Sequence, residues 1–361
     1  MSDLHGQSWR VLIVTDAWYP QVNGVVRTLD TIGGELAKMG HDVHFITPDL
    51  FRNIPCPTYP EIRLAVLPGR LLARMIDGMQ PCVVHVATEG PLGLAARNYC
   101  LKRKLPFTTS FHTRFPEYIE ARSKLPARWF YPAISWFHNA AACTMVATET
   151  LRDDLASKGF KKLGLWGRGV DVELFKPRDK DFLPDARPVL LYVGRVAVEK
   201  NIADFLELDA PGSKVVVGDG PQLASLKRKY PKVRFVGAKS GEELARYYAA
   251  ADVFVFPSRT DTFGNVVLEA LASGVPVAAY PVPGPKDVLQ GQPVGALRED
   301  LGQAVREALA ISPDACRAFA LSQSWRASAE QFLSHVVPFE TAWPEHAKPA
   351  PKIHSTAMKS N

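Results

Sequence analysis

Two carboxylates that flank a predicted strand-to-helix junction are the most informative residues of the chain. An apolar strand is predicted to end at Pro257, and a helix is predicted to begin near Gly264. Asp261 precedes that helix, and Glu269 lies about one and a half turns inside it. Helix N-termini attract phosphate and hydroxyl oxygens, and carboxylates accept hydrogen bonds from vicinal hydroxyls. The pattern indicates a sugar or nucleotide site, unless Asp261 only caps the helix and Glu269 lies on the surface.

Two cations follow another predicted strand. Arg195 and Lys200 lie in the stretch YVGRVAVEKN, at the end of the apolar run 189–193. Open α/β sheets bind ligands at the carboxyl ends of their strands, so cations placed there would neutralise a diphosphate leaving group. Gly218 follows the next run, in the turn VGDGP, where a glycine lets the backbone approach a nucleotide closely. Each of these signals is weak alone, because such loops are often only connectors.

The first half of the chain contributes two more candidates. Gly24 lies in the first predicted strand-to-helix loop, PQVNGV, where a glycine would admit a phosphate. His112 lies in TSFHTRFPEY, just after a predicted strand, and a histidine there would be either catalytic or structural. All five segments follow strands, at the ends expected to line a cleft between two domains. The first half contains no Asp-x-Asp pair, so we assign no metal ligands.

Two series of short apolar runs must position these residues. The first series lies at 10–15, 42–47, 82–86, 107–111 and 145–147, with helices predicted over 27–39 and 91–104. The second series lies at 189–193, 214–217, 233–236, 253–256 and 275–279, with helices predicted over 241–250 and 264–273. Strands that alternate with helices predict parallel sheets. We therefore expect an α/β protein with two Rossmann-like domains, at 1–167 and 188–322, joined by a polar, proline-punctuated linker at 168–187.

Length and composition fit this organisation. At 361 residues the chain is longer than a domain with one hydrophobic core usually is. Its composition, with 47% apolar and 22% charged residues, is ordinary for a globular protein. The five cysteines are scattered and lack metal-ligand spacing, which favours reduced thiols in a cytoplasmic protein. We expect no signal peptide and no membrane-spanning segment. The polar tail at 341–361 is predicted to be disordered.

A basic, aromatic stretch lies within the first series of runs. Between Arg97 and Arg128, eight cations are opposed only by Glu117 and Glu120. The aromatic residues in and just beyond it include Phe111, Phe115, Tyr118, Trp129, Phe130, Tyr131, Trp136 and Phe137. This mixture suits an anionic membrane surface, although a solvated basic face beside core aromatics would give the same pattern. Nucleic-acid binding is not expected, because no recognition motif accompanies the charge.

With these motifs in view, nearly the whole chain resembles the retaining family-4 glycosyltransferases of the GT-B fold. The resemblance runs from RVLIVTDAWYPQVNGVVRT to SWRASAEQFL. The signature of that family, two glutamates separated by seven residues, is present here as Asp261-TFGNVVL-Glu269, so the first carboxylate is one methylene shorter. The resemblance implies two facing Rossmann-like domains with a cleft between them, and a helix over 323–340 that crosses back to the first domain.

The resemblance also implies a role for each candidate. Asp261 would hold the donor sugar and Glu269 the nucleotide ribose, Arg195 and Lys200 would clamp the diphosphate, and His112 would lie near the anomeric carbon. The implied catalytic residues are His112, Arg195, Lys200 and Asp261. The implied donor-binding residues are Gly24, Arg195, Lys200, Gly218, Asp261, Phe263, Gly264, Asn265, Val266 and Glu269. No cofactor, no metal and no enzymatic nucleophile are implied.

The stretches SFHTRFPEY, WGRGVD and KVVVGDGP most resemble bacterial glycolipid synthases and related mannosyltransferases. This resemblance implies a metal-independent transfer of a hexose or hexuronic acid to a lipid acceptor, diacylglycerol, at the cytoplasmic face of the membrane, with a UDP-sugar favoured over GDP-mannose as donor. The first alternative is a GDP-mannose-dependent mannosyltransferase with another acceptor. A nucleotide-sugar epimerase of the same architecture is a second. A dinucleotide-binding protein is a third, but the first loop lacks the G-x-G-x-x-G pattern.

Overall fold

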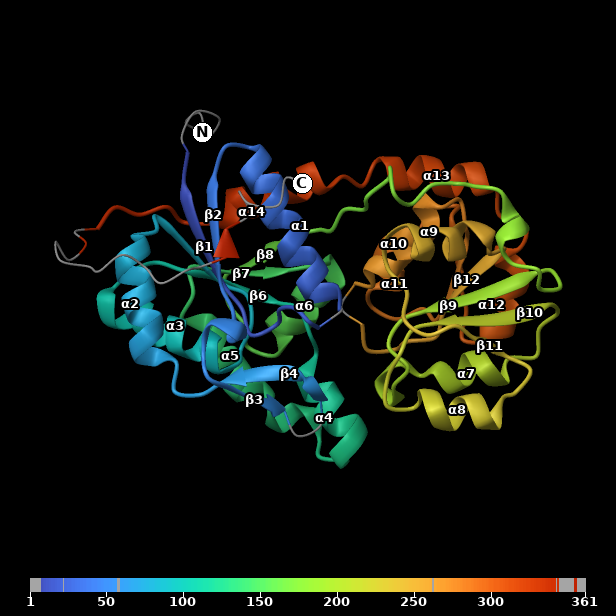
Figure 1. The fold of residues 1–361 in the computed structure, drawn as a ribbon, viewed down its shortest axis with the longest axis horizontal. Helices are drawn as coiled ribbons and strands as arrows, with labels where there is room; N and C mark the ends of the chain where they lie inside the picture. Colours follow the sequence, from blue (N-terminus) through green and yellow to red (C-terminus); the bar gives the residue numbers. More distant parts are fainter. Residues whose placement is uncertain are drawn as a thin grey trace. The chain divides into compact units, whose positions relative to one another are not determined.

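The chain folds into two compact units, as a computed structural model shows (Figure 1). The structure describes residues 8–21, 23–56, 59–261, 263–341, 343 and 354–355. The first unit consists of the described residues within Met1–His112, Arg128–Gly167 and Arg326–Asn361. The second unit takes those within Thr113–Ala127 and Arg168–Trp325. Each unit is built on its own sheet with helices packed against it.

A seven-stranded sheet forms the first unit, in the order β15-β2-β1-β5-β6-β7-β8. The strands are β1 (Arg10–Val14), β2 (Asp42–Ile46), β5 (Val83–Val86), β6 (Thr108–Phe111), β7 (Cys143–Val146), β8 (Leu163–Leu165) and β15 (His354–Ser355). All pairs are parallel except that of β15 with β2. The strand order reverses at β1, which pairs with β2 on one side and β5 on the other. The loops after β1 and β5 therefore meet at the switch point, where open sheets bind ligands.

Six helices and a hairpin complete the first unit. The helices are α1 (Gly24–Lys38), α2 (Gly69–Met79), α3 (Pro91–Arg103), α5 (Tyr131–Asn139), α6 (Glu149–Ser157) and α14 (Trp325–His335), and the hairpin strands are β3 (Asn53–Cys56) and β4 (Tyr59–Ala65). The short turns are η1 (Pro48–Leu50) and η2 (Ala127–Trp129). α14 is held to the sheet because the Trp166 indole N–H donates to Ser328 Oγ at 3.1 Å and the Phe332 ring packs on His85.

The second unit contains a six-stranded, fully parallel sheet in the order β11-β10-β9-β12-β13-β14. The strands are β9 (Val189–Val193), β10 (Ser213–Val217), β11 (Arg234–Phe235), β12 (Val253–Phe256), β13 (Val277–Ala279) and β14 (Gly295–Leu297). This is the 3-2-1-4-5-6 order of a doubly wound sheet. The order reverses between β9 and β12, so the loops that follow these two strands define the switch point of this unit.

Helices cover both faces of the second sheet. They are α7 (Ile202–Glu207), α8 (Leu223–Lys229), α9 (Gly241–Ala250), α10 (Asn265–Ala272), α11 (Pro285–Leu289), α12 (Leu301–Ala308) and α13 (Pro313–Leu321), with the short turns η3 (Lys180–Phe182) and η4 (Val198–Lys200). A further helix of this unit, α4 (Phe115–Ser123), contacts η4. Leu191 and Phe254 pack on one face with α9 and α10, whereas Leu190 and Val253 pack on the other with α7 and α12. The strands of this sheet are apolar at successive positions because the sheet is buried on both faces.

The sequence-based prediction of two parallel-sheet α/β domains is confirmed, and several elements match closely. The predicted runs at 189–193 and 253–256 and the helix at 241–250 have the observed bounds of β9, β12 and α9. β13 begins two residues later than predicted, because Val275 N–H closes the end of α10 by donating to the Ala270 carbonyl at 2.9 Å. α1 begins before the predicted start because Asn23 caps it, accepting from the N–H groups of Val25 and Val26.

The segment Thr113–Ala127 differs from the expected organisation. The sequence predicts this segment within the first domain, but its contacts group it with the second unit. Tyr118 on α4 is in hydrogen-bond contact with Lys200 on η4, and this contact explains the grouping. Of the predicted disordered tail, only residues 341, 343, 354 and 355 lie among the described residues. No helix in the described part of the chain is long and apolar enough to cross a membrane.

Candidate active site

The loops after β9 and β12 are joined at the switch point of the second unit. Asn201 Nδ2 donates to the Pro257 carbonyl at 3.2 Å, and Thr260 Oγ1 donates to the Glu199 carbonyl at 3.1 Å. On the β9 side, the buried Tyr192 hydroxyl donates to the Arg195 carbonyl at 2.7 Å. These three hydrogen bonds hold the loop with Arg195 and Lys200 beside the loop with Asp261.

Lys200 and Asp261 form a close ion pair at this junction. Burial alone would lower the pKa of Lys200, but the adjacent Asp261 carboxylate outweighs burial and raises the pKa above its usual range. The ammonium group is therefore a permanent cation at neutral pH. Asp261 uses Oδ1 for the ion pair, and no donor among the described residues reaches its buried Oδ2. One carboxylate oxygen is thus available to accept a hydrogen bond from a ligand hydroxyl.

Gly218 allows the loops after β9 and β10 to touch. Its φ is +150°, and a Cβ built there would lie 1.8 Å from the Gly194 carbonyl oxygen. No other residue fits at this distance. The close approach fixes the turn VGDGP against the loop that begins at Gly194 and continues to Arg195.

The N-terminus of α10 carries the second predicted carboxylate. Gly264 precedes α10 with a φ of +85° and has no side chain that could cap the helix, and Asn265 and Val266 form its first turn. The alternative that Asp261 only caps this helix is wrong, because Asp261 Oδ1 accepts from Lys200 Nζ. The alternative that Glu269 lies on the surface is also wrong, because Glu269 is 6% exposed and its Oε2 accepts from the Tyr248 hydroxyl at 2.9 Å. Phe263, which precedes Gly264 in the chain, is partly buried against the hydrophobic core of the second unit.

The structure therefore brings nine of the predicted residues together in the second unit, around the carboxyl ends of β9, β10 and β12. They are Arg195, Lys200, Gly218, Asp261, Phe263, Gly264, Asn265, Val266 and Glu269. The other two, Gly24 and His112, belong to the first unit. Gly24 is the first residue of α1, where Asn23 Oδ1 already accepts from the Val25 and Val26 N–H groups at 3.0 Å each.

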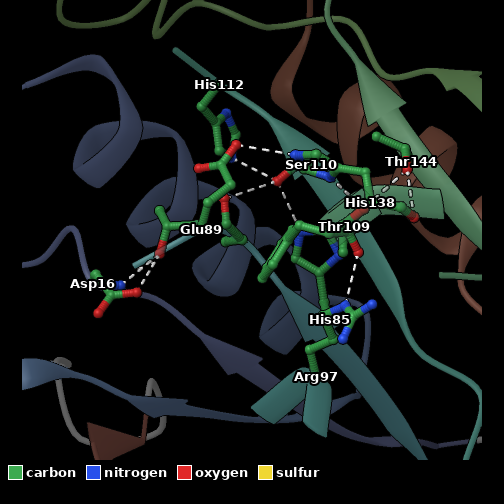
Figure 2. A network of polar contacts seen from close by, with 12 residues as sticks. Asp16, His85, Glu89, Arg97, Thr109, Ser110, His112, His138 and Thr144 are labelled. Carbon is green, nitrogen blue, oxygen red and sulfur yellow. Dashed lines mark hydrogen bonds and ion pairs between the residues drawn. The ribbon is translucent and has the colours of Figure 1, made fainter. Parts of the chain in front are cut away.

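His112 follows β6 in the first unit and ends a network of polar contacts (Figure 2). Its Nε2 lies 2.8 Å from Ser110 Oγ, and its ring meets the Trp166 ring edge-on, with centroids 5.7 Å apart. Ser110 in turn contacts His85. Sequence reasoning missed this chain of contacts. The signal was present, since polar residues in a buried strand such as β6 (TTSF) need buried partners.

A second set of carboxylates, also missed, surrounds the switch point of the first unit (Figure 2). His138 Nε2 lies 3.0 Å from Glu89 Oε1, and His138 Nδ1 lies 2.9 Å from Thr109 Oγ1. Asp16, after β1, accepts from the Leu92 and Gly93 N–H groups at the start of α3. Burial raises the pKa of Asp16 to about 6, although these hydrogen bonds oppose the rise.

The basic, aromatic stretch is not uniformly exposed. Arg97 is 5% exposed, and its guanidinium carbon lies 3.7 Å from the centroid of the Trp136 ring. Arg114 is also buried and faces Glu117. These two cations do not contribute to a solvated basic face. The exposed cations of the stretch whose side chains are described are Lys102, Arg103, Lys104, Lys124 and Arg128.

Comparisons with known proteins identify the family of the chain. The family model described as Glycosyltransferase Family 4 matches residues 22–174, and one described as Glycosyl transferases group 1 matches residues 187–311. The GDP-mannose-dependent alpha-mannosyltransferase of Mycobacterium tuberculosis is 31% identical, over 90% of this chain and 96% of the relative. The chain belongs to the family 4 glycosyltransferases. It is an enzyme of this class, as its sequence predicts.

Two further likenesses refine the comparison. The alpha-monoglucosyldiacylglycerol synthase of Streptococcus pneumoniae is 28% identical, over 91% of this chain and 85% of the relative. The structure of sucrose-phosphate synthase from Thermosynechococcus elongatus matches with a TM-score of 0.71 at 20% identity, over 90% of this chain and 98% of that one. This likeness shows the fold, which is the predicted GT-B fold. The individual roles of the site residues, retention of configuration and metal independence remain predictions for this glycosyltransferase.

Proposed function

We propose that this glycosyltransferase moves a hexosyl group from a nucleoside diphosphate sugar to a lipid of the diacylglycerol type, with retention of configuration and without a metal ion. The observation that carries the proposal is the Lys200–Asp261 pair at the switch point of the second sheet. Lys200 is a cation that can neutralise the departing diphosphate, and Asp261 Oδ2 can accept a hydrogen bond from the sugar. In the proposal, two adjacent side chains thus neutralise the leaving group and bind the sugar.

The proposed reaction needs charge stabilisation more than it needs a protein nucleophile. As the bond from the anomeric carbon to the diphosphate breaks, negative charge grows on the phosphate oxygens. Lys200 and Arg195 lie on one loop and supply two positive charges there. In the proposal, the acceptor hydroxyl attacks from the face that the diphosphate leaves, which preserves the configuration.

A lipid acceptor is supported by the activity for which the Streptococcus pneumoniae relative is named and by the surface of the first unit. Trp129 is 61% exposed and Trp136 is 57% exposed. Leu101 is exposed beside three exposed cations, Lys102, Arg103 and Lys104, at the end of α3. Indole rings and cations favour the headgroup region of an anionic membrane. We propose that these residues hold the enzyme on the cytoplasmic leaflet that contains its acceptor.

A second candidate function is the transfer of mannose from GDP-mannose to a different acceptor. The Mycobacterium tuberculosis relative, which is named for this donor, favours it. The expected preference for a uridine donor has no support in these relatives. GDP-mannose therefore belongs beside the UDP-sugars in any first experiment.

The test is a transfer assay with the purified protein. Vesicles that contain diacylglycerol are incubated with GDP-mannose, UDP-glucose, UDP-galactose or UDP-glucuronate, each with and without EDTA, and lipid products are identified by mass spectrometry. We expect an α-linked glycolipid from one or two donors, formed equally well in EDTA. Donor turnover without glycolipid would support the second candidate. Loss of activity in EDTA would contradict metal independence, and isomerised donor alone would indicate an epimerase.

A further inference from the structure

One tyrosine lies beside the Lys200–Asp261 pair without belonging to it. Tyr118 is on α4, which is part of the second unit and contacts η4 there. Its hydroxyl is in hydrogen-bond contact with Lys200, and the carboxylates of Asp261 and Glu199 are near enough to affect its pKa. The second unit therefore places a phenol next to the cation that the proposed function assigns to the diphosphate.

The hydrogens of this contact can point in only one direction. The Lys200 ammonium group donates up to three hydrogen bonds and accepts none. One of its hydrogens goes to Asp261 Oδ1, so the Tyr118 oxygen must accept another. The hydroxyl hydrogen of Tyr118 then remains, and no acceptor for it lies among the residues that the structure describes. This hydrogen is available to a ligand that approaches Lys200.

The surroundings of Tyr118 keep that hydrogen in place at neutral pH. Burial raises the pKa of the phenol, and the carboxylates of Asp261 and Glu199 act in the same direction against the opposing charge of Lys200. The phenol is therefore neutral and can donate. The Phe115 ring, about one turn earlier on α4, packs edge-on against the Tyr118 ring with centroids 6.4 Å apart. This packing restricts the directions in which the hydroxyl can point.

The pairing of Lys200 indicates which part of the donor Tyr118 meets. In the proposed function Asp261 binds the sugar, and Lys200 is paired with Asp261. The phosphate joined to the sugar of a nucleoside diphosphate sugar is the β-phosphate, so Lys200 faces that phosphate. A hydroxyl in contact with Lys200 reaches the same oxygens. A cation and a neutral donor together suit a phosphate that gains negative charge as the sugar leaves.

We propose that Tyr118 is a donor-binding residue whose hydroxyl donates a hydrogen bond to the β-phosphate of the nucleotide sugar, beside Lys200. The proposal deepens the proposed function and rests on it, because both place the diphosphate at Lys200. It adds a side chain of α4 to a site otherwise built from the loops after β9, β10 and β12. In the sequence, Tyr118 stands out only as one aromatic residue of the basic stretch.

Calorimetric titration of the full-length protein tests the contact. Tyr118→Phe removes only the hydroxyl. The probes are GDP and UDP, which carry a β-phosphate, and GMP and UMP, which lack it. For the nucleotides that the wild type binds, we expect Tyr118→Phe to bind the diphosphate about tenfold more weakly and the monophosphate within about twofold of the wild type.

Tyr230→Phe is the matched control, because it removes a hydroxyl of the same unit that bonds to Glu207 and not to Lys200. It should bind all four nucleotides as the wild type does. Binding of the diphosphate by Tyr118→Phe within about twofold of the wild type would overturn the proposal. Equal weakening for diphosphate and monophosphate would overturn it as well, since a merely structural role of the hydroxyl does not distinguish the two ligands.

Lys200→Met separates failure of this proposal from failure of the proposed function. If Lys200→Met binds the diphosphate more weakly than the wild type and Tyr118→Phe does not, only the role of Tyr118 is overturned. If Lys200→Met binds it as tightly as the wild type, the proposed donor site fails and the role of Tyr118 fails with it. If Tyr118→Phe weakens diphosphate binding as expected but the wild type forms no glycolipid, the proposed acceptor is contradicted and the Tyr118 contact is supported.

Discussion

At the scale of single residues, the proposed donor site depends on the positive charge of Lys200, which is paired with Asp261. The Lys200 ammonium is held by Asp261, across 61 residues of sequence, and this pairing raises the lysine pKa. The same carboxylate keeps a second oxygen for a ligand. The residue types and their order along the chain indicated a sugar nucleotide site, but their pairing followed only from the fold, because β9 and β12 are neighbours in the sheet although β10 and β11 separate them in sequence.

Asp16 yields a prediction about stability and pH. Its carboxyl is buried, with a pKa raised from 3.8 to about 6. The folded state therefore favours the protonated form, and this contribution is complete below about pH 4 and lost as the pH rises through 6. Asp16→Asn removes the titration. We expect the free energy of unfolding of the wild type, relative to that of Asp16→Asn, to fall by about 3 kcal/mol over this window.

Urea unfolding of both proteins from pH 4 to 7.5 measures this difference. Other titrating groups are common to the two proteins and largely cancel. A difference that stays constant with pH would mean that Asp16 is already ionised in the acidic range and that its contacts with α3 and Thr88 stabilise the charge fully.

At the scale of elements, the site is built by loops that touch at glycines. β9, β12 and α9 were predictable because continuous apolar runs bounded by glycine or proline are typical of buried parallel strands and the helices between them. The β3–β4 hairpin and the three-residue strands β8 and β14 were not predicted, because their apolar patterns are too short to differ from loops. The polar chain through Ser110 was missed because its partners lie on different strands.

Gly218 provides the prediction at this scale. Gly218→Ala would place a Cβ against the Gly194 carbonyl and push the loop with Arg195 and Lys200 out of position. We expect donor affinity to fall at least about tenfold and stability to fall by about 2 kcal/mol. Calorimetric titration with the nucleoside diphosphate measures the affinity.

The matched control is Gly291→Ala, which has a φ of +75° but open space around its Cβ. This variant tests backbone strain without a collision, so it should lose about 1–2 kcal/mol of stability and keep its donor affinity. Equal losses of affinity in both variants would show that general destabilisation, and not the Gly194 contact, explains the effect.

At the scale of the whole molecule, a net charge of +6 and a set of exposed apolar residues in the first unit are the basis of the proposed contact with an anionic membrane. The two-domain organisation and the parallel sheets were predictable because strand and helix patterns repeat in both halves, whereas the GT-B fold was implied by the resemblance of the motifs to the family 4 glycosyltransferases. Burial of Arg97 was not predictable, since it depends on the Trp136 ring, which the fold brings beside it from 39 residues further along the chain.

Trp129 tests the membrane contact. Trp129→Ser should weaken binding to vesicles that contain phosphatidylglycerol on the order of fivefold, because partial burial of an indole is worth about 1 kcal/mol. Added salt should weaken binding further. Co-sedimentation measures both effects. Leu321→Ser, which changes a similarly exposed apolar residue of the second unit, is expected to bind as the wild type does; equal weakening in both variants would contradict the proposed surface.

The most direct test of the central claim is the rate of glycolipid formation by Lys200→Met at saturating donor. Methionine is close in length to lysine but carries no charge, so the variant removes the cation from the diphosphate while filling its space. Loss of one group that stabilises the transition state predicts a fall in kcat of about a hundredfold, with the fold intact by circular dichroism. A variant that forms glycolipid as fast as the wild type would contradict the assignment of this site to the sugar nucleotide.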